Sequence, residues 1–290
     1  MTQSGNRWIV RVVLVIAVLA FVGVSMVPII AAFNESRGSG SSAADTKGNL
    51  PTVDQKSKLQ DEVRGYELVL QREPENQTAL KALLQARLQL LALKQGEIKD
   101  VIEPLSKLAK LNPDQTRYAV LLAQAKQQMG DNEGAAQTLR TVLETRPGDM
   151  EALQAMVSLQ MSQKRPEAAI GLLQEALTKA PQANKIQPGS IDTIAIQVLI
   201  GNIHASQKRY GKAFEVYEQA IKSDPKDFRP IWAKALVLKE QGKIDEARPL
   251  FANATALAPA QYKDEINKTA TEAPSPKPTP TANPTTSPTP

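Results

Sequence analysis

The chain has 290 residues, with 35 Lys and Arg, 30 Asp and Glu, one His, no Cys and 20 Pro, and aromatic residues make up only 4% of it. Without cysteine it cannot hold a disulfide framework, a thiolate nucleophile or a cysteine-ligated zinc, and with His204 as its one imidazole it cannot form a multi-histidine metal site. Three of the basic residues, Arg7, Arg11 and Lys277, lie in terminal stretches without acidic residues, so the middle of the chain is almost neutral and the formal charge of +5 does not indicate nucleic-acid binding.

The first predicted element is a membrane anchor over residues 1–33. Residues 12–33 contain no charge, and as a helix they would be about 33 Å long, enough to cross a hydrocarbon core of about 30 Å. The alternative is a cleavable signal peptide, whose apolar region is usually about 7–15 residues long and ends at a small-x-small site. Arg7 and Arg11 precede the run, which slightly favours an N-terminus inside and the remaining chain on the extracytoplasmic side.

Two segments are expected to lack a packed core. Residues 34–53 are rich in Gly, Ser and Asp without apolar periodicity, which predicts a flexible linker. Residues 269–290 predict a disordered tail, because 273–290 contain seven prolines and favour extended polyproline II. The tail is open to interpretation as a docking peptide, a spacer or a solvated low-complexity segment.

Between these segments, regularly spaced prolines indicate a repeat. Six prolines are predicted to end amphipathic helical stretches, and they follow one another at intervals of 39, 34, 34, 44 and 34 residues. Fixed-period self-similarity is typical of stacked-repeat proteins. The prolines are Pro74, Pro113, Pro147, Pro181, Pro225 and Pro259. Apolar periodicity predicts helix pairs at 115–129 with 132–144, 150–163 with 166–179, 191–207 with 210–222, and 228–241 with 244–257.

A small, large, small pattern recurs on the second helix of each pair. Its spacing of four and then three residues places the three side chains on one helix face, where neighbouring helices approach closely. The triplets are Ala135, Leu139 and Val142; Ala169, Leu173 and Ala176; Ala213, Tyr217 and Ala220; Ala247, Phe251 and Ala254. With the 34-residue step and the closing proline, the pattern resembles the tetratricopeptide repeat (TPR) family over about residues 77–261. We therefore predict an all-α fold, a right-handed TPR solenoid of about five helix pairs over residues 77–268, preceded by the single transmembrane helix.

Several features depart from the family pattern. The Trp, Leu-Gly and Tyr usual in first helices are mostly absent apart from Ile200-Gly201, and His204 stands where a tyrosine is usual. Residues 54–76 predict one helix without a pair of its own, packed as an N-terminal cap. Pro104 and Pro249 predict kinks about two turns inside second helices.

Ten extra residues precede the fourth repeat. Pro188-Gly189 predicts a turn there, with Ser190 as the cap of a longer first helix. This insertion and the following repeat are similar to the membrane-anchored TPR proteins of the Slow Green type from plastids and cyanobacteria. That resemblance implies a role in thylakoid or chloroplast biogenesis.

The sequence carries no signature of an enzyme. The acidic pairs Asp61-Glu62 and Asp245-Glu246 are adjacent, so on a helix their side chains point apart, and His204 is read as a packed or solvated histidine. No loop combines glycines with the Lys and Ser or Thr that cradle a phosphate. We predict no catalytic residue, no metal, no cofactor and no small-molecule substrate.

The TPR resemblance implies a concave face, lined by first helices, that binds a protein or peptide. The resemblance places Arg117, Val120, Gln124, Gln127, Glu151, Gln154, Ser158, Val198, Asn202, Arg229 and Trp232 on or near that face. Receptors for chaperone tails carry a Lys four residues before an Asn, but Val198 stands at that place before Asn202, so we expect no such receptor. Trp232 fits a recognition role, and core packing fits it equally well.

These features predict a membrane-anchored TPR scaffold that mediates protein–protein interactions in the assembly or maintenance of a membrane protein complex. We expect a single-pass protein of a plasma or thylakoid membrane, attached through residues 12–33, with the TPR domain on the extracytoplasmic side and no nucleic-acid partner. The alternative is a structural or cell-envelope protein in which the TPR array self-associates and the Pro/Thr tail is a spacer.

Overall fold

The computed structural model describes residues 53–272, which contain helices and no strand, as the sequence predicts. The predicted anchor (1–33), all but the last residue of the linker (34–53) and most of the tail (269–290) lie outside the described residues. Within 53–272, no helix combines the length and the apolar character needed to cross a membrane.

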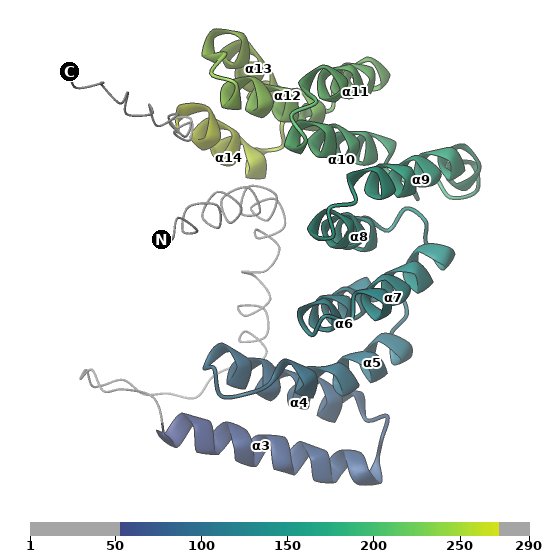
Figure 1. Cartoon of the computed structure of the whole chain (residues 1–290), viewed down its shortest axis with the longest axis vertical. Helices are drawn as coiled ribbons and strands as arrows, with labels where there is room; N and C mark the ends of the chain where they lie inside the picture. Colours follow the sequence, from purple (N-terminus) through teal and green to yellow (C-terminus); the bar gives the residue numbers. More distant parts are fainter. Residues whose placement is uncertain (1–52, 273–290) are drawn as a thin grey trace, which may run out of the picture. The chain divides into compact units, whose positions relative to one another are not determined.

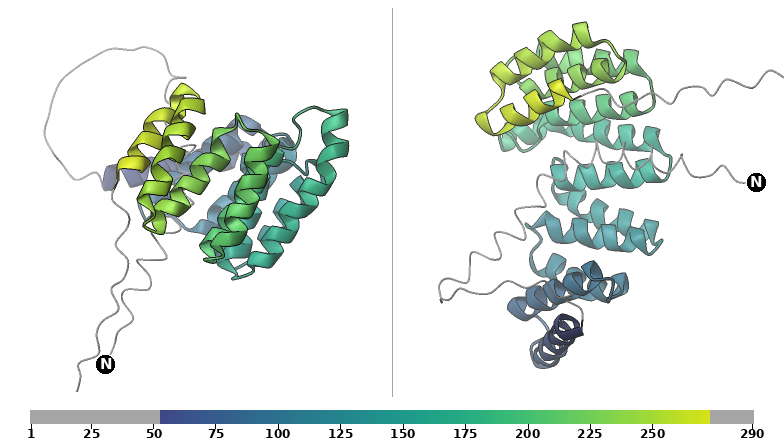
Figure 2. Two further views of the ribbon diagram at one scale, coloured as in Figure 1. Left: turned by 90° about the horizontal axis from the view of Figure 1, so that it is seen from above. Right: turned by 90° about the vertical axis from the view of Figure 1, so that its left-hand side faces the viewer.

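The described helices stack as consecutive antiparallel pairs (Figures 1 and 2). Helix α3 (Val53–Arg72) precedes the first pair and packs against its first helix. The pairs are α4 (Gln77–Ala92) with η1 (Ile98–Val101) and α5 (Ile102–Leu111), α6 (Thr116–Gln128) with α7 (Asn132–Thr145), α8 (Met150–Ser162) with α9 (Pro166–Ile186), α10 (Thr193–Ser206) with α11 (Tyr210–Ser223), and α12 (Phe228–Glu240) with α13 (Ile244–Leu257). Helix α14 (Ala260–Thr271) packs against the last pair.

Polar side chains fix where most first helices begin. Asn76, Asp149, Asp192 and Asp227 are the N-cap residues of α4, α8, α10 and α12, and each accepts a hydrogen bond from a backbone N–H of the first turn. These caps satisfy amides that the helix itself cannot pair. Most turns between pairs therefore end in a residue that caps the next helix.

Within each pair the turn needs a residue in the left-handed region. Gly130 and Gly242 supply it in two pairs, with φ of 86° and 81°. Lys94, Lys164 and Lys208 supply it in the other three, with φ of 56°, 60° and 58°. A side chain at such a φ is less favourable than glycine, so these lysines carry a conformational cost.

The predicted triplets of the second helices all lie in the core. The least buried of them, Val142, is 9% exposed, and Leu173, Tyr217 and Ala254 are fully buried. The prediction of small residues at close helix contacts is therefore confirmed. Gly201 shows the same requirement on a first helix, because a Cβ built there would lie 2.2 Å from Cε1 of Tyr217.

Three predictions about prolines and caps are wrong. Pro181 does not end its helix, since α9 continues to Ile186 with the exposed Pro181 inside it. Ser190 is not the cap of α10, because the N-cap residue of that helix is Asp192 and the helix begins at Thr193. Pro104 lies in the first turn of α5, where its missing N–H has no helical partner to lose, rather than deep inside a helix. Pro249 does lie inside α13.

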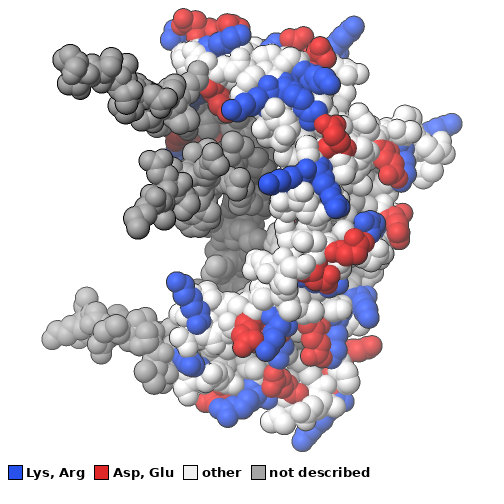
Figure 3. Space-filling model, in the orientation of Figure 1, with Lys and Arg blue, Asp and Glu red and all other residues white. Residues whose placement is uncertain are grey.

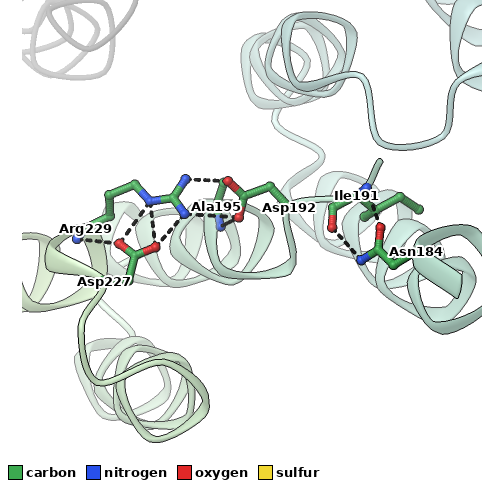
Figure 4. Close-up of polar contacts among 6 residues, drawn as sticks. All are labelled: Asn184, Ile191, Asp192, Ala195, Asp227 and Arg229. Atoms are coloured by element: carbon green, nitrogen blue, oxygen red, sulfur yellow. Dashed lines mark hydrogen bonds and ion pairs between the residues drawn. The ribbon is translucent and has the colours of Figure 1, made fainter. Parts of the chain in front are cut away.

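Asn184 anchors the loop that replaces the predicted helix end. Its side-chain amide donates to the carbonyl of Ile191 (2.9 Å) and accepts from the backbone N–H of Ile191 (2.8 Å) and the hydroxyl of Ser190 (Figure 4). Gly148 of the preceding loop makes room for this turn, since a Cβ there would lie 2.2 Å from the carbonyl oxygen of Ser190. The insertion is therefore an ordered extension of α9 followed by a tied loop.

Candidate protein-binding surface

The candidate surface is formed by the first helices, and we refer to it as the first-helix face. Helix α6 packs against α8 and α10 packs against α12, so the first helices within each of these two pairs are neighbours. The predicted residues are Arg117, Val120, Gln124 and Gln127 on α6, Glu151, Gln154 and Ser158 on α8, Val198 and Asn202 on α10, and Arg229 and Trp232 on α12.

On α6 the predicted residues form a half-buried stripe. Their spacing of three and four residues places Arg117, Val120, Gln124 and Gln127 on one helix face, and each is partly accessible. The amide of Gln127 donates to the hydroxyl of Ser162 on α8 (2.8 Å), which links the two first helices. The guanidinium of Arg117 lies 5.3 Å from the centre of the Tyr118 ring.

Helix α8 presents the most accessible of the predicted residues. Glu151 and Ser158 are exposed, and Gln154 between them is half-buried. None of the three has a hydrogen-bond or ion-pair partner among residues 53–272 beyond its own helix backbone, so their polar groups are available to a ligand. Glu151 is also the one formal charge on α8, and α10 has none.

Helix α10 contributes one accessible residue and one core residue. Asn202 is exposed and its side-chain oxygen accepts the hydroxyl proton of Tyr217 at 2.6 Å. Burial raises the pKa of Tyr217, so the hydroxyl remains a donor. Val198 is only 9% exposed and packs with Ala213 and Tyr217. It belongs to the core and cannot be reached by a ligand on this face.

Trp232 is part of the core as well. It is 6% exposed, its ring lies 6.4 Å from that of Phe228, and its indole N–H donates to the hydroxyl of Thr269 on α14 (3.2 Å). Helix α14 thus covers the tryptophan. Of the two roles open to Trp232 in the sequence, the structure shows core packing.

Arg229 is held by two carboxylates rather than presented to a ligand. Its guanidinium bonds both oxygens of Asp192, with 2.6 Å from Nη1 and 3.1 Å from Nη2, and it also bonds Asp227 (Figure 4). Hydrogen bonds to Asp227 and Asp192 raise the pKa of Arg229 despite its partial burial. Burial acts to raise the pKa of Asp192, but the bonds from Arg229 and from backbone amides outweigh it and hold that pKa below its usual range. This cluster joins the N-termini of α10 and α12.

Sequence reasoning missed the apolar contribution to the first-helix face. Leu88 on α4 and Leu236 on α12 are 40% and 37% exposed. Leu236 follows Trp232 by four residues and Arg229 by seven, so the helical spacing that selected those two also selects it. In residues 53–272 no group of three or more His, Asp or Glu side chains is placed to hold a metal ion.

Comparisons with known proteins agree with this geometry. Two tetratricopeptide repeat family models match the chain, one at residues 92–159 and one at 194–227. The chain is 29% identical over 192 residues to protein SLOW GREEN 1, chloroplastic, of Arabidopsis thaliana, covering 66% of this chain and 58% of that protein. It is 26% identical over 171 residues to cellulose synthase operon protein C of Pseudomonas fluorescens, covering 59% of this chain and 13% of that one. The chain therefore spans less than two thirds of the length of either relative.

Two solved structures are also similar to part of this chain. A crystal structure of MamA protein is 20% identical, with a TM-score of 0.38, over 70% of this chain and 100% of that chain. Yeast Tom70 is 16% identical, with a TM-score of 0.47, over 72% of this chain and 42% of that chain. The predicted repeat type is confirmed over residues 92–159 and 194–227, where tetratricopeptide repeat models match the chain.

Proposed function

We propose that the chain is a membrane-anchored scaffold whose TPR solenoid binds a protein or peptide on the first-helix face. The observation that carries this proposal is the set of polar groups on α8 without internal partners, at Glu151, Gln154 and Ser158. Accessible polar groups that have no partner within the protein can exchange their hydrogen bonds with water for hydrogen bonds with a ligand. Tetratricopeptide repeats favour protein or peptide ligands over small substrates.

The character of this surface favours a weakly charged, extended segment of a partner. The predicted residues that remain accessible carry amide and hydroxyl groups together with one cation and one anion, Arg117 and Glu151. Amide side chains can donate and accept, which suits the backbone of an extended peptide. The exposed Leu236 and Leu88 add apolar contacts at the two ends of the row.

Membrane attachment through residues 12–33 and assembly of a membrane protein complex are part of the same proposal. The uncharged run of 12–33 supports attachment, and the similarity to SLOW GREEN 1, whose name places it in the chloroplast, favours a thylakoid membrane over a plasma membrane. We place the solenoid on the extracytoplasmic side because Arg7 and Arg11 precede the run. Protease accessibility of the solenoid in sealed vesicles tests this placement, and cleavage of the repeats only from the cytoplasmic side would reject it.

Site-specific crosslinking tests the binding surface. A photoreactive residue in place of Ser158 or Gln154 is expected to crosslink a partner in native membranes. The matched control is Gln174, an exposed residue of α9, the second helix of the same pair. Equal crosslinking from Gln174, or none from α8, would contradict the proposal.

A charge introduced on the same surface gives a second, independent measurement. Gln154→Arg together with Ser158→Arg is expected to release the partner while leaving the helical circular dichroism signal unchanged, because both positions are accessible. Retention of the partner by this variant would place binding elsewhere on the chain.

A further inference from the structure

A separate surface lies at the turns inside the third and fourth helix pairs. Five cations gather there: Lys164 and Arg165 between α8 and α9, and Lys208, Arg209 and Lys212 at the turn from α10 into α11. We refer to them as the basic turn patch. Figure 3 shows that Lys and Arg side chains lie among Asp and Glu side chains over the region where Figure 1 draws α9, α10 and α11, so the patch is defined by its residues.

Four of these cations are free of internal partners. Lys164, Arg165, Lys208 and Lys212 are exposed, and none of them forms an ion pair within residues 53–272. Arg209 pairs with Glu167 of α9, and this bond joins the two turns into one surface. Glu167 cancels one of the five charges and Glu215 of α11 lies nearby, so the five cations and these two acids leave an excess of positive charge.

The backbone conformation at these two turns costs free energy that a glycine would avoid. Lys164 and Lys208 adopt φ of 60° and 58°, where Gly130 and Gly242 stand in the turns on either side. The next residues, Arg165 and Arg209, occupy the N-cap positions of α9 and α11 and form no side-chain cap. Asp, Asn, Ser or Thr would cap these helices, and a cation meets the positive end of the helix dipole. Stability is therefore given up at these four cationic positions, as it also is at Lys94 and at Lys243, the uncapped N-cap residue of α13.

The neighbouring turns limit the size of the ligand. Asp131 and Glu133 stand at the corresponding turn between α6 and α7, and Asp245 and Glu246 stand at the one between α12 and α13. Glu133, Asp245 and Glu246 pair with Arg140, Arg248 and Lys243, so these turns lack the excess of positive charge found in the patch. An anionic membrane laid along this edge would meet these acidic groups on both sides of the patch. A short acidic segment of another protein meets the cations alone, which fits the charge pattern better.

We propose that the basic turn patch binds a short acidic segment of a partner protein. This site lies on the turns, apart from the first-helix face, and does not depend on a ligand there. The carboxylates of the segment would replace counterions around Lys164, Arg165, Lys208 and Lys212 and would be held by charge, so binding weakens with salt.

The test uses the full chain in neutral detergent micelles and a fluorescent oligoglutamate peptide as the probe. Anisotropy is expected to show saturable binding that salt suppresses, with no binding of the matching oligoglutamine. The double variant Lys164→Gly, Lys208→Gly is expected to weaken binding by at least about tenfold, since two of five cations are lost. The same variant should unfold at a higher temperature, because glycine relieves both turns.

The control variant makes the same change of charge elsewhere. Lys185→Gln with Lys222→Gln removes two exposed cations near the C-terminal ends of α9 and α11, and it should bind oligoglutamate as the unchanged chain does. Equal loss in both variants, or unchanged binding in the glycine variant, would overturn the proposal. Displacement of oligoglutamate when phosphatidylserine is added to the micelles would overturn it in favour of a lipid surface.

Discussion

The cluster of Arg229, Asp192 and Asp227 should stabilise the packing of the last two helix pairs against each other, and Arg229→Met tests this. Methionine keeps much of the aliphatic length and removes every hydrogen bond to the two carboxylates. Asp227 is 12% exposed and Asp192 is 38% exposed, against 28% for the arginine side chain. Both acids keep their N-cap bonds, so the change removes the ion pair without removing the caps.

The magnitude follows from this intermediate burial. Breaking a fully buried ion pair costs about 3–5 kcal/mol, whereas an exposed pair contributes about 0–1 kcal/mol. A cluster about a third exposed, with solvent screening, should contribute about 2 kcal/mol. Because each 1.36 kcal/mol corresponds to a factor of ten, opening of α12–α14 should become about 30-fold more frequent.

Hydrogen exchange resolves the effect along the stack, since repeat proteins open locally rather than all at once. Protection should fall by that factor in α12 and α13 and change little in α6 and α7. The control is Arg248→Met, because Arg248 and Asp245 are 76% and 98% exposed and 3.8 Å apart, and it should change exchange by less than about threefold. A uniform increase in exchange rate along the whole stack, or an effect no larger than that of the control, would refute this stabilising role.

The pH dependence of stability is a second test of this ion pair. The pKa of Asp192 is held below its ordinary value of 3.8, so its contribution is fully present above about pH 4 and is lost as the pH falls through the lowered value. The difference between the unchanged chain and Arg229→Met should therefore narrow only in that acidic window.

Three further changes test packing, backbone and protonation. Gly201→Ala should destabilise the chain by about 3 kcal/mol, because the added Cβ would clash with the buried ring of Tyr217. Gly171→Ala, which has open space around it, should stabilise the chain by about 1 kcal/mol. The two variants should shift the thermal midpoint in opposite directions. Lys94→Gly, at a φ of 56°, should raise the urea midpoint by an amount equivalent to about 0.5–1 kcal/mol, and a lower midpoint would contradict strain at that turn. Burial and nearby cations lower the pKa of His204 below its ordinary 6.5, so the stability of the chain should decline as the pH falls below 6.5. His204→Gln should remove that decline. An unchanged pH profile in this variant would show that another group causes the decline.

Most of the fold could be predicted from local sequence patterns. The start of α7, both ends of α13 and the buried triplets follow from apolar spacing and turn residues that lie within a few positions of one another. Each triplet, such as Ala213, Tyr217 and Ala220, needs only its own helix for its spacing to be visible in the sequence. These features could be predicted because their causes are close together along the chain.

The wrong predictions have causes farther along the chain or outside the pattern used. The sequence predicts that Pro181 stops α9, but the proline is exposed there and the helix continues to Ile186. The loop that follows turns back, so that Asn184 bonds Ile191. Trp232 is buried because α14 covers it through Thr269, 37 residues later. Arg229 is withdrawn from the candidate surface by Asp192, also 37 residues away. Thr269 and Asp192 lie too far along the chain for a local pattern to connect them with Trp232 and Arg229.

The same capping chemistry explains why the two edges of the stack carry different charge. First helices need N-caps at the proline turns, and Asp149, Asp192 and Asp227 supply them, which places acidic groups on that edge. Second helices α9, α11 and α13 begin at Arg165, Arg209 and Lys243 with no side-chain cap, although a cap is worth about 1 kcal/mol and a cation there opposes the helix dipole. Asp131, which caps α7, shows that an aspartate can stand at this kind of turn in this chain. The cations of α9 and α11 are therefore not required by the fold, and a ligand that needs positive charge gives them a physical reason to be there.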